Sequence, residues 1–106
     1  MVPPFEKRGD KMREKVLEQM LVKAVKNAGG AAPKFVSPGL DGMPDRLVLL
    51  PVEMMGFVEV KAPGEKPRPL QLARHRMLRG LGFKVYVLDD EEQIDKIIGE
   101  IGGDAL

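Results

Sequence analysis

Apolar residues recur at helical spacing in the first quarter of the chain. Between residues 10 and 28 they fall three or four positions apart, which is the spacing of one face of an α-helix. The positions on that face are Met12, Val16, Leu17, Met20, Leu21, Ala24 and Val25. Two glycines, Gly29 and Gly30, follow, and glycine commonly ends a helix. We therefore expect an amphipathic helix over residues 10–28, with Glu14 and Glu18 on one flank of its apolar face.

The middle of the chain has a pattern typical of strands. Residues 46–50 (RLVLL) and 57–61 (FVEVK) are short β-prone runs. The segment between them, residues 51–56, supplies a proline and a glycine for a chain reversal. Neither run alternates cleanly between apolar and polar residues, which is typical of strands that are covered on both faces. We expect a hairpin of two buried strands, preceded by a brief strand at residues 34–36.

The last third of the chain predicts a helix, a strand and a short helix. A Pro-rich, charged connection over residues 62–69 leads into a helix over residues 69–81. The apolar face expected for this helix consists of Leu70, Ala73, Met77, Leu78 and Leu81. A strand over residues 83–88 and a helix over residues 91–101 follow. The order of elements predicts one α/β domain spanning residues 1–106, with its core at about 10–101 and a central mixed sheet flanked by helices.

Composition narrows the class of protein. The chain has 106 residues, no cysteine and a single histidine, His75, which argues against disulfides, thiol chemistry and a zinc site. No apolar run approaches the roughly 20 residues that span a bilayer, and residues 1–8 lack the apolar core of a signal peptide. We expect a soluble, cytoplasmic protein with no membrane contact. A single modest core in so short a chain makes oligomerisation a reasonable expectation.

The net charge of +1 conceals a strong asymmetry along the chain. Residues 1–88 contain 16 Lys and Arg against 9 Asp and Glu, whereas residues 89–106 contain one Lys against 7 Asp and Glu. A basic body suits a polyanion, because Lys and Arg contacts to phosphates supply much of the affinity for nucleic acid. Ordinary solubilising charge explains the same balance equally well. The acidic residues around Glu91 complement the dipole of a helix that begins there.

The candidate catalytic residues lie at the predicted hairpin. Pro44-Asp45 opens the first strand, and Glu59 and Lys61 share one face of the second, because side chains alternate along a strand. Carboxylates are the ligands that suit Mg²⁺ or Mn²⁺. Taken separately, a solvated Glu-Lys pair and a Pro-Asp turn are common. Together on neighbouring strands they favour a metal site that cuts phosphodiester bonds.

The order of elements and these motifs resemble the PD-(D/E)XK nuclease superfamily and, more narrowly, the VRR-NUC family of virus-type replication and repair nucleases. The similarity spans residues 14–98. It rests on Gly29-Gly30, residues 34–39 (KFVSPG), 42–47 (GMPDRL) and 57–64 (FVEVKAPG), and Gln71. The resemblance implies a restriction-endonuclease-like αβββαβα core.

The resemblance also implies roles for individual residues. Asp45 and Glu59 would bind the divalent metal, with the Val60 carbonyl as a further ligand, and Lys61 would position or activate the attacking water. The acidic residue of the first helix is Glu18, with Glu14 as the alternative, and Gln71 would orient site groups or the scissile phosphate. The side chains that we expect to contact DNA are Lys34, Arg68, Arg74, His75, Arg76 and Arg79.

The family pattern implies metal-dependent hydrolysis of DNA that leaves a 5′-phosphate and a 3′-hydroxyl. The resemblance to small stand-alone members of the family further implies a homodimer that cuts branched DNA such as four-way junctions. It also implies a role in phage or bacterial replication, recombination or repair. Two alternatives stay open from the sequence. The chain could be a module that binds DNA or a replication partner without catalysis, or a nuclease that acts on flaps, nicks or RNA.

Overall fold

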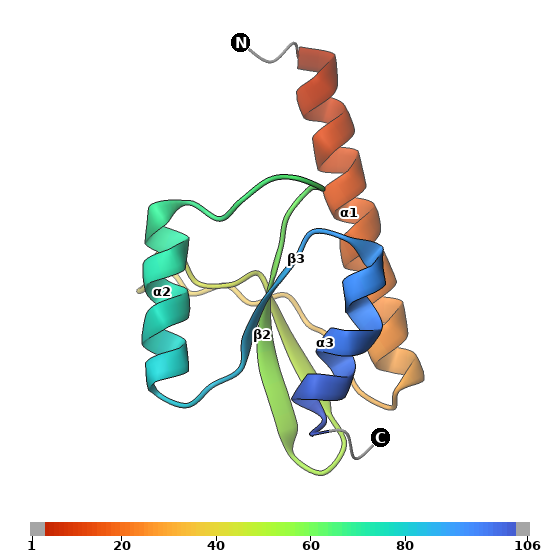
Figure 1. The fold of residues 1–106 in the computed structure, drawn as a ribbon, viewed down its shortest axis with the longest axis vertical. Helices are drawn as coiled ribbons and strands as arrows, with labels where there is room; N and C mark the ends of the chain where they lie inside the picture. Colours follow the sequence, from red (N-terminus) through yellow and green to blue (C-terminus); the bar gives the residue numbers. More distant parts are fainter. Residues whose placement is uncertain (1–3, 104–106) are drawn as a thin grey trace.

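The computed structural model of the protein describes residues 4–103, with side chains from Lys11 onward. The ends of the predicted 1–106 domain therefore lie outside the described residues. The elements are α1 (Pro4–Asn27), β1 (Arg46–Leu50), β2 (Met54–Val60), α2 (Pro69–Gly80), β3 (Val85–Leu88), the 3₁₀-helix η1 (Glu91–Gln93) and α3 (Ile94–Ile101). Figure 1 shows α2 on one side of the sheet and α1 and α3 on the other. The predicted α/β class, with a mixed sheet flanked by helices, is confirmed.

The sheet has the strand order β1-β2-β3. β1 and β2 run antiparallel, with Arg46 opposite Val58, whereas β2 and β3 run parallel. β2 begins three residues earlier than predicted, because the chain reverses tightly at residues 51–53 and does not use Gly56 for the turn. A Cβ atom at Gly56 would lie 2.8 Å from the Ile101 side chain. The glycine therefore serves the packing of α3 against the strand.

The strand that we predicted at residues 34–36 is reduced to isolated bridges. Ala31 pairs with Leu49 and Lys34 pairs with Arg46, both antiparallel to β1. Pro33 lies between the two bridges and has no N–H to donate, so the ladder is interrupted there. The αβββαβα order is thus present with its first strand broken, and the prediction of a regular strand at 34–36 is wrong.

One large core fills the space between the sheet and the pair α1 and α3. It contains Leu17, Leu21, Val25, Val48, Leu50, Val58, Val60, Leu88, Ile94, Ile97, Ile98 and Ile101, together with Ala32. Met12 and Val16, which we placed on the apolar face of α1, are 66% and 52% exposed. Their end of α1 extends beyond the sheet (Figure 1). Neither α1 nor any other helix in the described part of the chain is long and apolar enough to cross a membrane.

The opposite face of the sheet packs against α2 through a smaller core of Phe57, Leu78 and Val85. The buried residues of α2 are Gln71, His75 and Leu78. Leu70 and Leu81, predicted to be buried, are 47% and 69% exposed. The predicted apolar face of this helix is therefore wrong in its orientation, because two polar side chains turn inward to meet a buried carboxyl group on β2.

Candidate active site

Asp45 and Glu59 lie opposite each other at the end of the sheet where β1 begins and β2 ends. Arg46 pairs with Val58, so the next antiparallel position outward brings Asp45 beside Glu59. The backbone N–H of Val60 donates a hydrogen bond to Asp45 Oδ2 at 3.0 Å. This bond fixes the Asp45 carboxyl group against the end of β2. The structure therefore brings together the two acidic residues that the sequence singled out.

Glu59 is buried, with 1% of its surface exposed, and two side chains of α2 contact its carboxyl group. Gln71 Nε2 donates to Glu59 Oε2 at 3.3 Å, and His75 Nε2 lies 3.4 Å from Glu59 Oε1. Gln71 Oε1 accepts a hydrogen bond from the backbone N–H of Arg68 at 2.8 Å. Because that bond occupies the amide oxygen, the amide nitrogen of Gln71 is the atom that faces Glu59. The start of α2 thus fixes how Gln71 presents its donor.

The surroundings of Glu59, which include Asp45, raise the pKa of its carboxyl group. Burial, then a hydrogen bond to the Asp45 carboxyl group and the charge of Asp45, together raise the pKa of Glu59 to about 8. The positive charge of Lys61 opposes this rise in pKa. Two carboxylates held together away from water repel each other unless a proton or a cation neutralises one of them. The end of the sheet is therefore a place where a bound cation would be stabilising.

Glu18, predicted as the acidic residue of the first helix, forms an ion pair with Arg46. Arg46 Nη2 and Nε lie 2.8 and 3.0 Å from Glu18 Oε2. Arg46 Nη1 also donates to the carbonyl oxygen of Ala32 at 2.8 Å. The pair ties α1 to β1 and to the chain beside it. Its geometry is that of a structural contact.

Glu14, one turn before Glu18, is the α1 carboxyl group that interacts with the site. Burial and then the charge of Asp45 raise the pKa of Glu14, while Lys61 lowers it. Glu14 in turn contributes to the raised pKa of Glu59. Of the two alternatives on this helix, the structure therefore gives Glu14 the interactions with the predicted metal ligands and gives Glu18 a partner in Arg46.

Lys61 follows β2 directly, on the face of the strand that carries Glu59. Its backbone N–H donates to the carbonyl oxygen of Leu88 at 2.9 Å, which anchors this residue to the end of β3. The side chain is half-buried. Its charge lowers the pKa of both Glu14 and Glu59. Through this charge Lys61 interacts with the carboxyl groups of Glu14 and Glu59.

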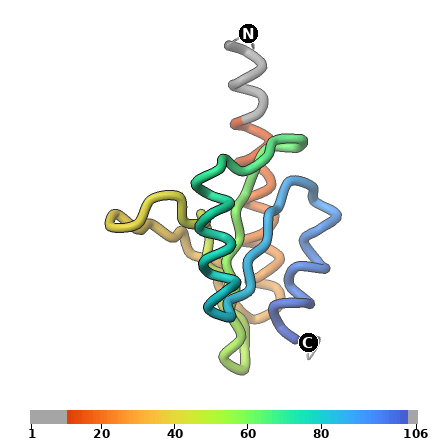
Figure 2. The backbone as a smooth tube through the Cα atoms, turned by 60° about the vertical axis from the view of Figure 1, so that its left-hand side comes forward, coloured from red at the N-terminus to blue at the C-terminus, as the bar shows by residue number. Residues whose placement is uncertain are grey.

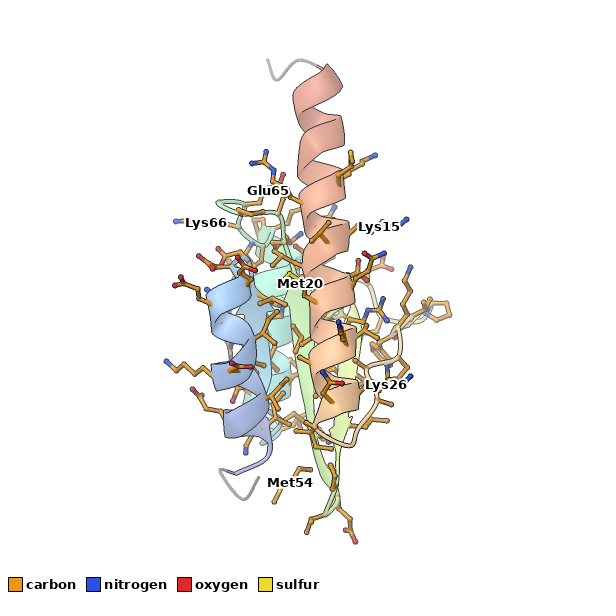
Figure 3. The ribbon with its side chains drawn as sticks, turned by 90° about the vertical axis from the view of Figure 1, so that its right-hand side faces the viewer. Lys15, Met20, Lys26, Met54, Glu65 and Lys66 are labelled. Carbon is orange, nitrogen blue, oxygen red and sulfur yellow. The ribbon has the colours of Figure 1, made fainter. Side chains whose placement is uncertain are left out.

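A hollow of about 240 Å³ opens beside Asp45 and is lined by Glu14, Glu18, Lys34, Phe35, Val36 and Asp45. A second groove of about 450 Å³ shares three of these residues and adds Lys11, Lys15, Gln19 and Arg46. Figure 3 places Lys15 at the same end of the molecule as Glu65 and Lys66 of the loop after β2, with Met54 at the opposite end. The acidic side chains of Glu14, Glu18 and Asp45 thus share these two hollows with the amines of Lys11, Lys15 and Lys34.

Two of the arginines that we expected to contact DNA are engaged by the backbone. Arg74 Nε donates to the carbonyl oxygen of Asp41 at 2.6 Å. This bond holds the loop before β1, which projects from the body of the protein in Figure 2. Arg79 Nη2 donates to the carbonyl oxygen of Val85 at 2.7 Å, which joins the end of α2 to β3. Both contacts give these residues a structural role.

The other predicted DNA contacts differ in exposure. Lys34 lines both hollows and is exposed, and Arg68 and Arg76 are exposed on the loop and the surface of α2. His75 is 1% exposed, so the prediction that it contacts DNA is wrong. Burial, with the charges of Arg79 and Lys61, lowers the pKa of His75. The helical spacing of Gln71 and His75 was the signal in the sequence that both face one partner.

The donor set fits a hard divalent cation. Within the described residues no group of three His, Cys, Asp or Glu side chains is arranged to hold a metal ion. Mg²⁺ is commonly held by one or two carboxylates and completes its coordination with water and substrate phosphates. Asp45 and Glu59 match that pattern. The Val60 carbonyl faces the same side as its N–H, which bonds to Asp45, because both groups of one strand residue point the same way.

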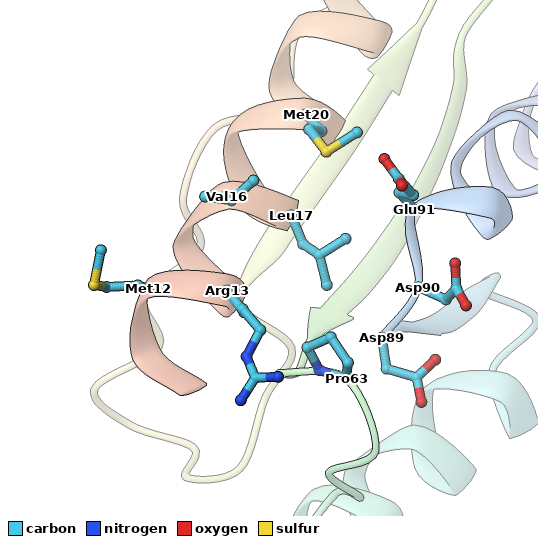
Figure 4. Close-up of a pocket in the computed structure, with 9 residues that line it drawn as sticks. All are labelled: Met12, Arg13, Val16, Leu17, Met20, Pro63, Asp89, Asp90 and Glu91. Atoms are coloured by element: carbon cyan, nitrogen blue, oxygen red, sulfur yellow. The ribbon is translucent and has the colours of Figure 1, made fainter. Parts of the chain in front are cut away.

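A larger hollow of about 490 Å³ lies between α1 and the start of η1. Its lining is mostly apolar on the α1 side, and Figure 4 shows Asp89, Asp90 and Glu91 across from Met12, Val16 and Leu17. Met20, Arg13 and Pro63 complete it. None of Asp45, Glu59 and Lys61 lines this hollow. This hollow is therefore not the candidate active site, although it is larger than the hollow beside Asp45.

Comparison with known proteins agrees with this geometry. No family profile matches the sequence. A protein named "Putative nuclease p44", from Acyrthosiphon pisum secondary endosymbiont phage 1, is 54% identical over 81 residues, which are 76% of this chain and 87% of that protein. A solved structure named "VRR_NUC domain" is similar with a TM-score of 0.76 and 34% identity, covering 81% of this chain and 94% of the other.

Proposed function

Because the chain belongs to the VRR-NUC family of nucleases, we propose that it is a divalent-metal-dependent endonuclease that hydrolyses phosphodiester bonds in DNA. The observation that carries this proposal is the adjacency of the buried Glu59 to Asp45. Burial first, and then the Asp45 carboxyl group, raise the pKa of Glu59 to about 8. Such a pair costs stability in the free protein. A module that only binds DNA or a protein has no use for it, whereas a site that takes up a cation does.

Asp45, Glu59 and the Val60 carbonyl are the groups that would hold Mg²⁺ or Mn²⁺. When bound, the ion polarises the phosphoryl group, lowers the pKa of a bound water and neutralises charge that develops during the reaction. The hydrogen bond from Val60 N–H to Asp45 keeps one carboxyl group in place. Gln71 and His75 keep the other in place from the α2 side.

The reaction that we propose is attack by water on a backbone phosphorus, with cleavage of the bond to the 3′ oxygen. It leaves a 5′-phosphate on one side and a 3′-hydroxyl on the other. Lys61 orients the attacking water and stabilises its loss of a proton, since its amine lies among the site carboxyl groups. Glu14 interacts with Asp45, Glu59 and Lys61, so it faces the same water from α1.

The DNA backbone would enter through the groove beside the site. Lys15 and Lys34 are exposed and line that groove, so they are placed to contact phosphates on either side of the scissile one. Each chain contributes one site. Cutting both strands of a branched molecule in symmetric positions therefore requires two copies, and we propose that a homodimer cuts branched DNA, with the four-way junction as the first candidate.

A panel of substrates tests this proposal. The protein is incubated with a four-way junction, a flap, a nicked duplex, a linear duplex and a single-stranded RNA, each with Mn²⁺ or with EDTA, and its mass in solution is measured in parallel. We expect Mn²⁺-dependent cleavage of the junction in preference to the linear duplex, 5′-phosphate products, and a mass of two chains. Cleavage that persists in EDTA, or no cleavage of any substrate with metal, would refute the proposed activity. Preference for the flap, the nick or RNA would refute only the junction.

A further inference from the structure

The structure assigns His75 a positioning role: its imidazole holds the Glu59 carboxylate in the orientation that receives the divalent cation. This inference rests on the proposed function, because it concerns the same metal site. It differs from the sequence-based expectation that His75 contacts DNA. His75 touches neither substrate nor metal in this account and acts only through Glu59.

The geometry places the Glu59 carboxyl group against side-chain nitrogens of two residues on one helix. Gln71 and His75 are four residues apart on α2, so their side chains lie one turn from each other on its buried face. Gln71 Nε2 contacts one oxygen of Glu59 and His75 Nε2 contacts the other, at 3.3 and 3.4 Å. A carboxylate with one donor on each oxygen has lost its freedom to rotate. Residues that support metal ligands in this way generally tune metal affinity.

The other ring nitrogen of His75 shows that burial alone does not explain the residue. His75 Nδ1 is buried and has no hydrogen-bond partner among the described residues. An unpaired polar atom inside a protein is unfavourable, and a side chain that only filled this space would be better aliphatic. In the tautomer whose Nε2 carries the proton toward Glu59, Nδ1 keeps only a lone pair. The single contact that justifies a histidine here is the one with Glu59.

Gln71 cannot replace this contact. Its amide oxygen is held by the backbone N–H of Arg68, so its nitrogen serves Oε2 of Glu59 and leaves Oε1 to His75. Glu59 lies one residue before the end of the central strand β2, and the hydrogen bond from Val60 to Asp45 fixes the backbone beside it. The two acids are therefore oriented independently, one from β2 and one from α2.

Three substitutions at position 75 separate positioning from packing. His75→Leu fills the space with a side chain that has no hydrogen-bond donor. His75→Gln places an amide nitrogen where the Nε2 atom of His75 lies. His75→Asn places its amide nitrogen near the position of Nδ1, away from Glu59. Leu78→Ala serves as a matched control, since Leu78 is buried on the same helix and belongs to the smaller core with Phe57 and Val85. For each protein we would measure Mn²⁺ affinity by calorimetry without DNA, kcat and KM for DNA cleavage, and thermal stability.

We expect His75→Leu to weaken Mn²⁺ binding by roughly 10-fold or more and to lower kcat with little change in KM, while His75→Gln retains most of both. His75→Asn should behave like His75→Leu, and Leu78→Ala should lose thermal stability but keep its Mn²⁺ affinity. Wild-type Mn²⁺ affinity in His75→Leu, or equal affinities in His75→Gln and His75→Asn, would overturn the inference. If His75→Leu does not fold, the Gln and Asn proteins decide the matter. A wild-type protein that binds no Mn²⁺ and cuts no DNA would instead refute the proposed function.

Discussion

Arg46 holds the Glu18 carboxylate in a two-point contact, with Nη2 and Nε 2.8 and 3.0 Å from the same oxygen. Only 14% of the arginine and 22% of the glutamate side chain are exposed. A pair of this kind is a better anchor than a fully solvated one, because water screens it less. It fixes the rotation of α1 over the sheet and leaves Glu14, one turn away, to face Asp45.

This contact predicts opposite effects for two similar substitutions on α1. Glu14→Gln should reduce DNA cleavage by roughly 10-fold to 100-fold without loss of stability. Glu18→Gln should leave most of the cleavage rate and lower the free energy of unfolding by about 1–3 kcal/mol, since Arg46 loses its charged partner. Cleavage rates and urea unfolding curves of the two variants check this. A catalytic defect in Glu18→Gln with normal cleavage by Glu14→Gln would contradict it.

The raised pKa of Glu59 predicts that the metal-free protein loses stability as pH rises from about 4.5 to about 8. Folded Glu59 keeps its proton up to about pH 8, whereas the unfolded chain releases it near pH 4.5. Between these values the folded state binds more protons, so the free energy of unfolding falls by up to about 1.4 kcal/mol per pH unit.

Unfolding by urea in EDTA between about pH 7 and pH 8 measures this slope. His75 has a lowered pKa, so its contribution rises with pH only below about 6.5 and is complete in this window. Glu59→Gln is the matched control and should have a flatter pH dependence. Equal slopes in the two proteins would show that Glu59 is not the group responsible.

Asp45→Asn and Lys61→Ala should each abolish cutting while the protein stays folded. Asp45→Asn removes a charge that raises the pKa of Glu59, so it should also stabilise the metal-free protein near pH 8. Lys61→Ala removes the amine that orients water. Lys66→Ala, at an exposed position in the loop that follows, is its control and should cut normally. Loss of folding in Asp45→Asn would support a purely structural pairing.

Lys15 and Lys34 predict where the DNA backbone runs. Lys15→Glu and Lys34→Glu should weaken DNA binding and reduce its dependence on salt, by a slope of about 0.9 for each phosphate contact that is lost. Lys26→Glu, on α1 but toward the other end of the molecule (Figure 3), should have little effect. Fluorescence anisotropy with a catalytically inactive variant over a range of salt concentrations measures this. Equal losses in all three would mean that the effect is only one of net charge.

The sequence predicted the fold class and the central acids well because both depend on local patterns. Alternation along residues 57–61 was enough to place Glu59 and Lys61 on one face, and the run at 46–50 matches β1. The strand at 34–36 was overestimated, since Pro33 removes a donor between the bridges at Ala31 and Lys34.

The side chains of the helices were harder to place from the sequence. Hydrophobic periodicity put Leu70 and Leu81 inside, but α2 buries Gln71 and His75 instead, because a buried carboxyl group on the neighbouring strand needs donors. The same kind of long-range partner distinguishes Glu18, which pairs with Arg46, from Glu14, which interacts with Asp45. Nothing in the local sequence shows that Arg46, 28 positions away, takes Glu18.

The position of a bound metal ion is the decisive test of the proposal that Asp45 and Glu59 form a metal site. Crystals grown with Mn²⁺ and measured near the manganese absorption edge would locate the ion by its anomalous signal. We predict a peak between Asp45 and Glu59, with a carboxylate oxygen of each within about 2.2 Å and the Val60 carbonyl adjacent. An anomalous peak only at the acidic residues 89–92, with none between Asp45 and Glu59, would contradict the assignment of this site as a metal-dependent nuclease centre.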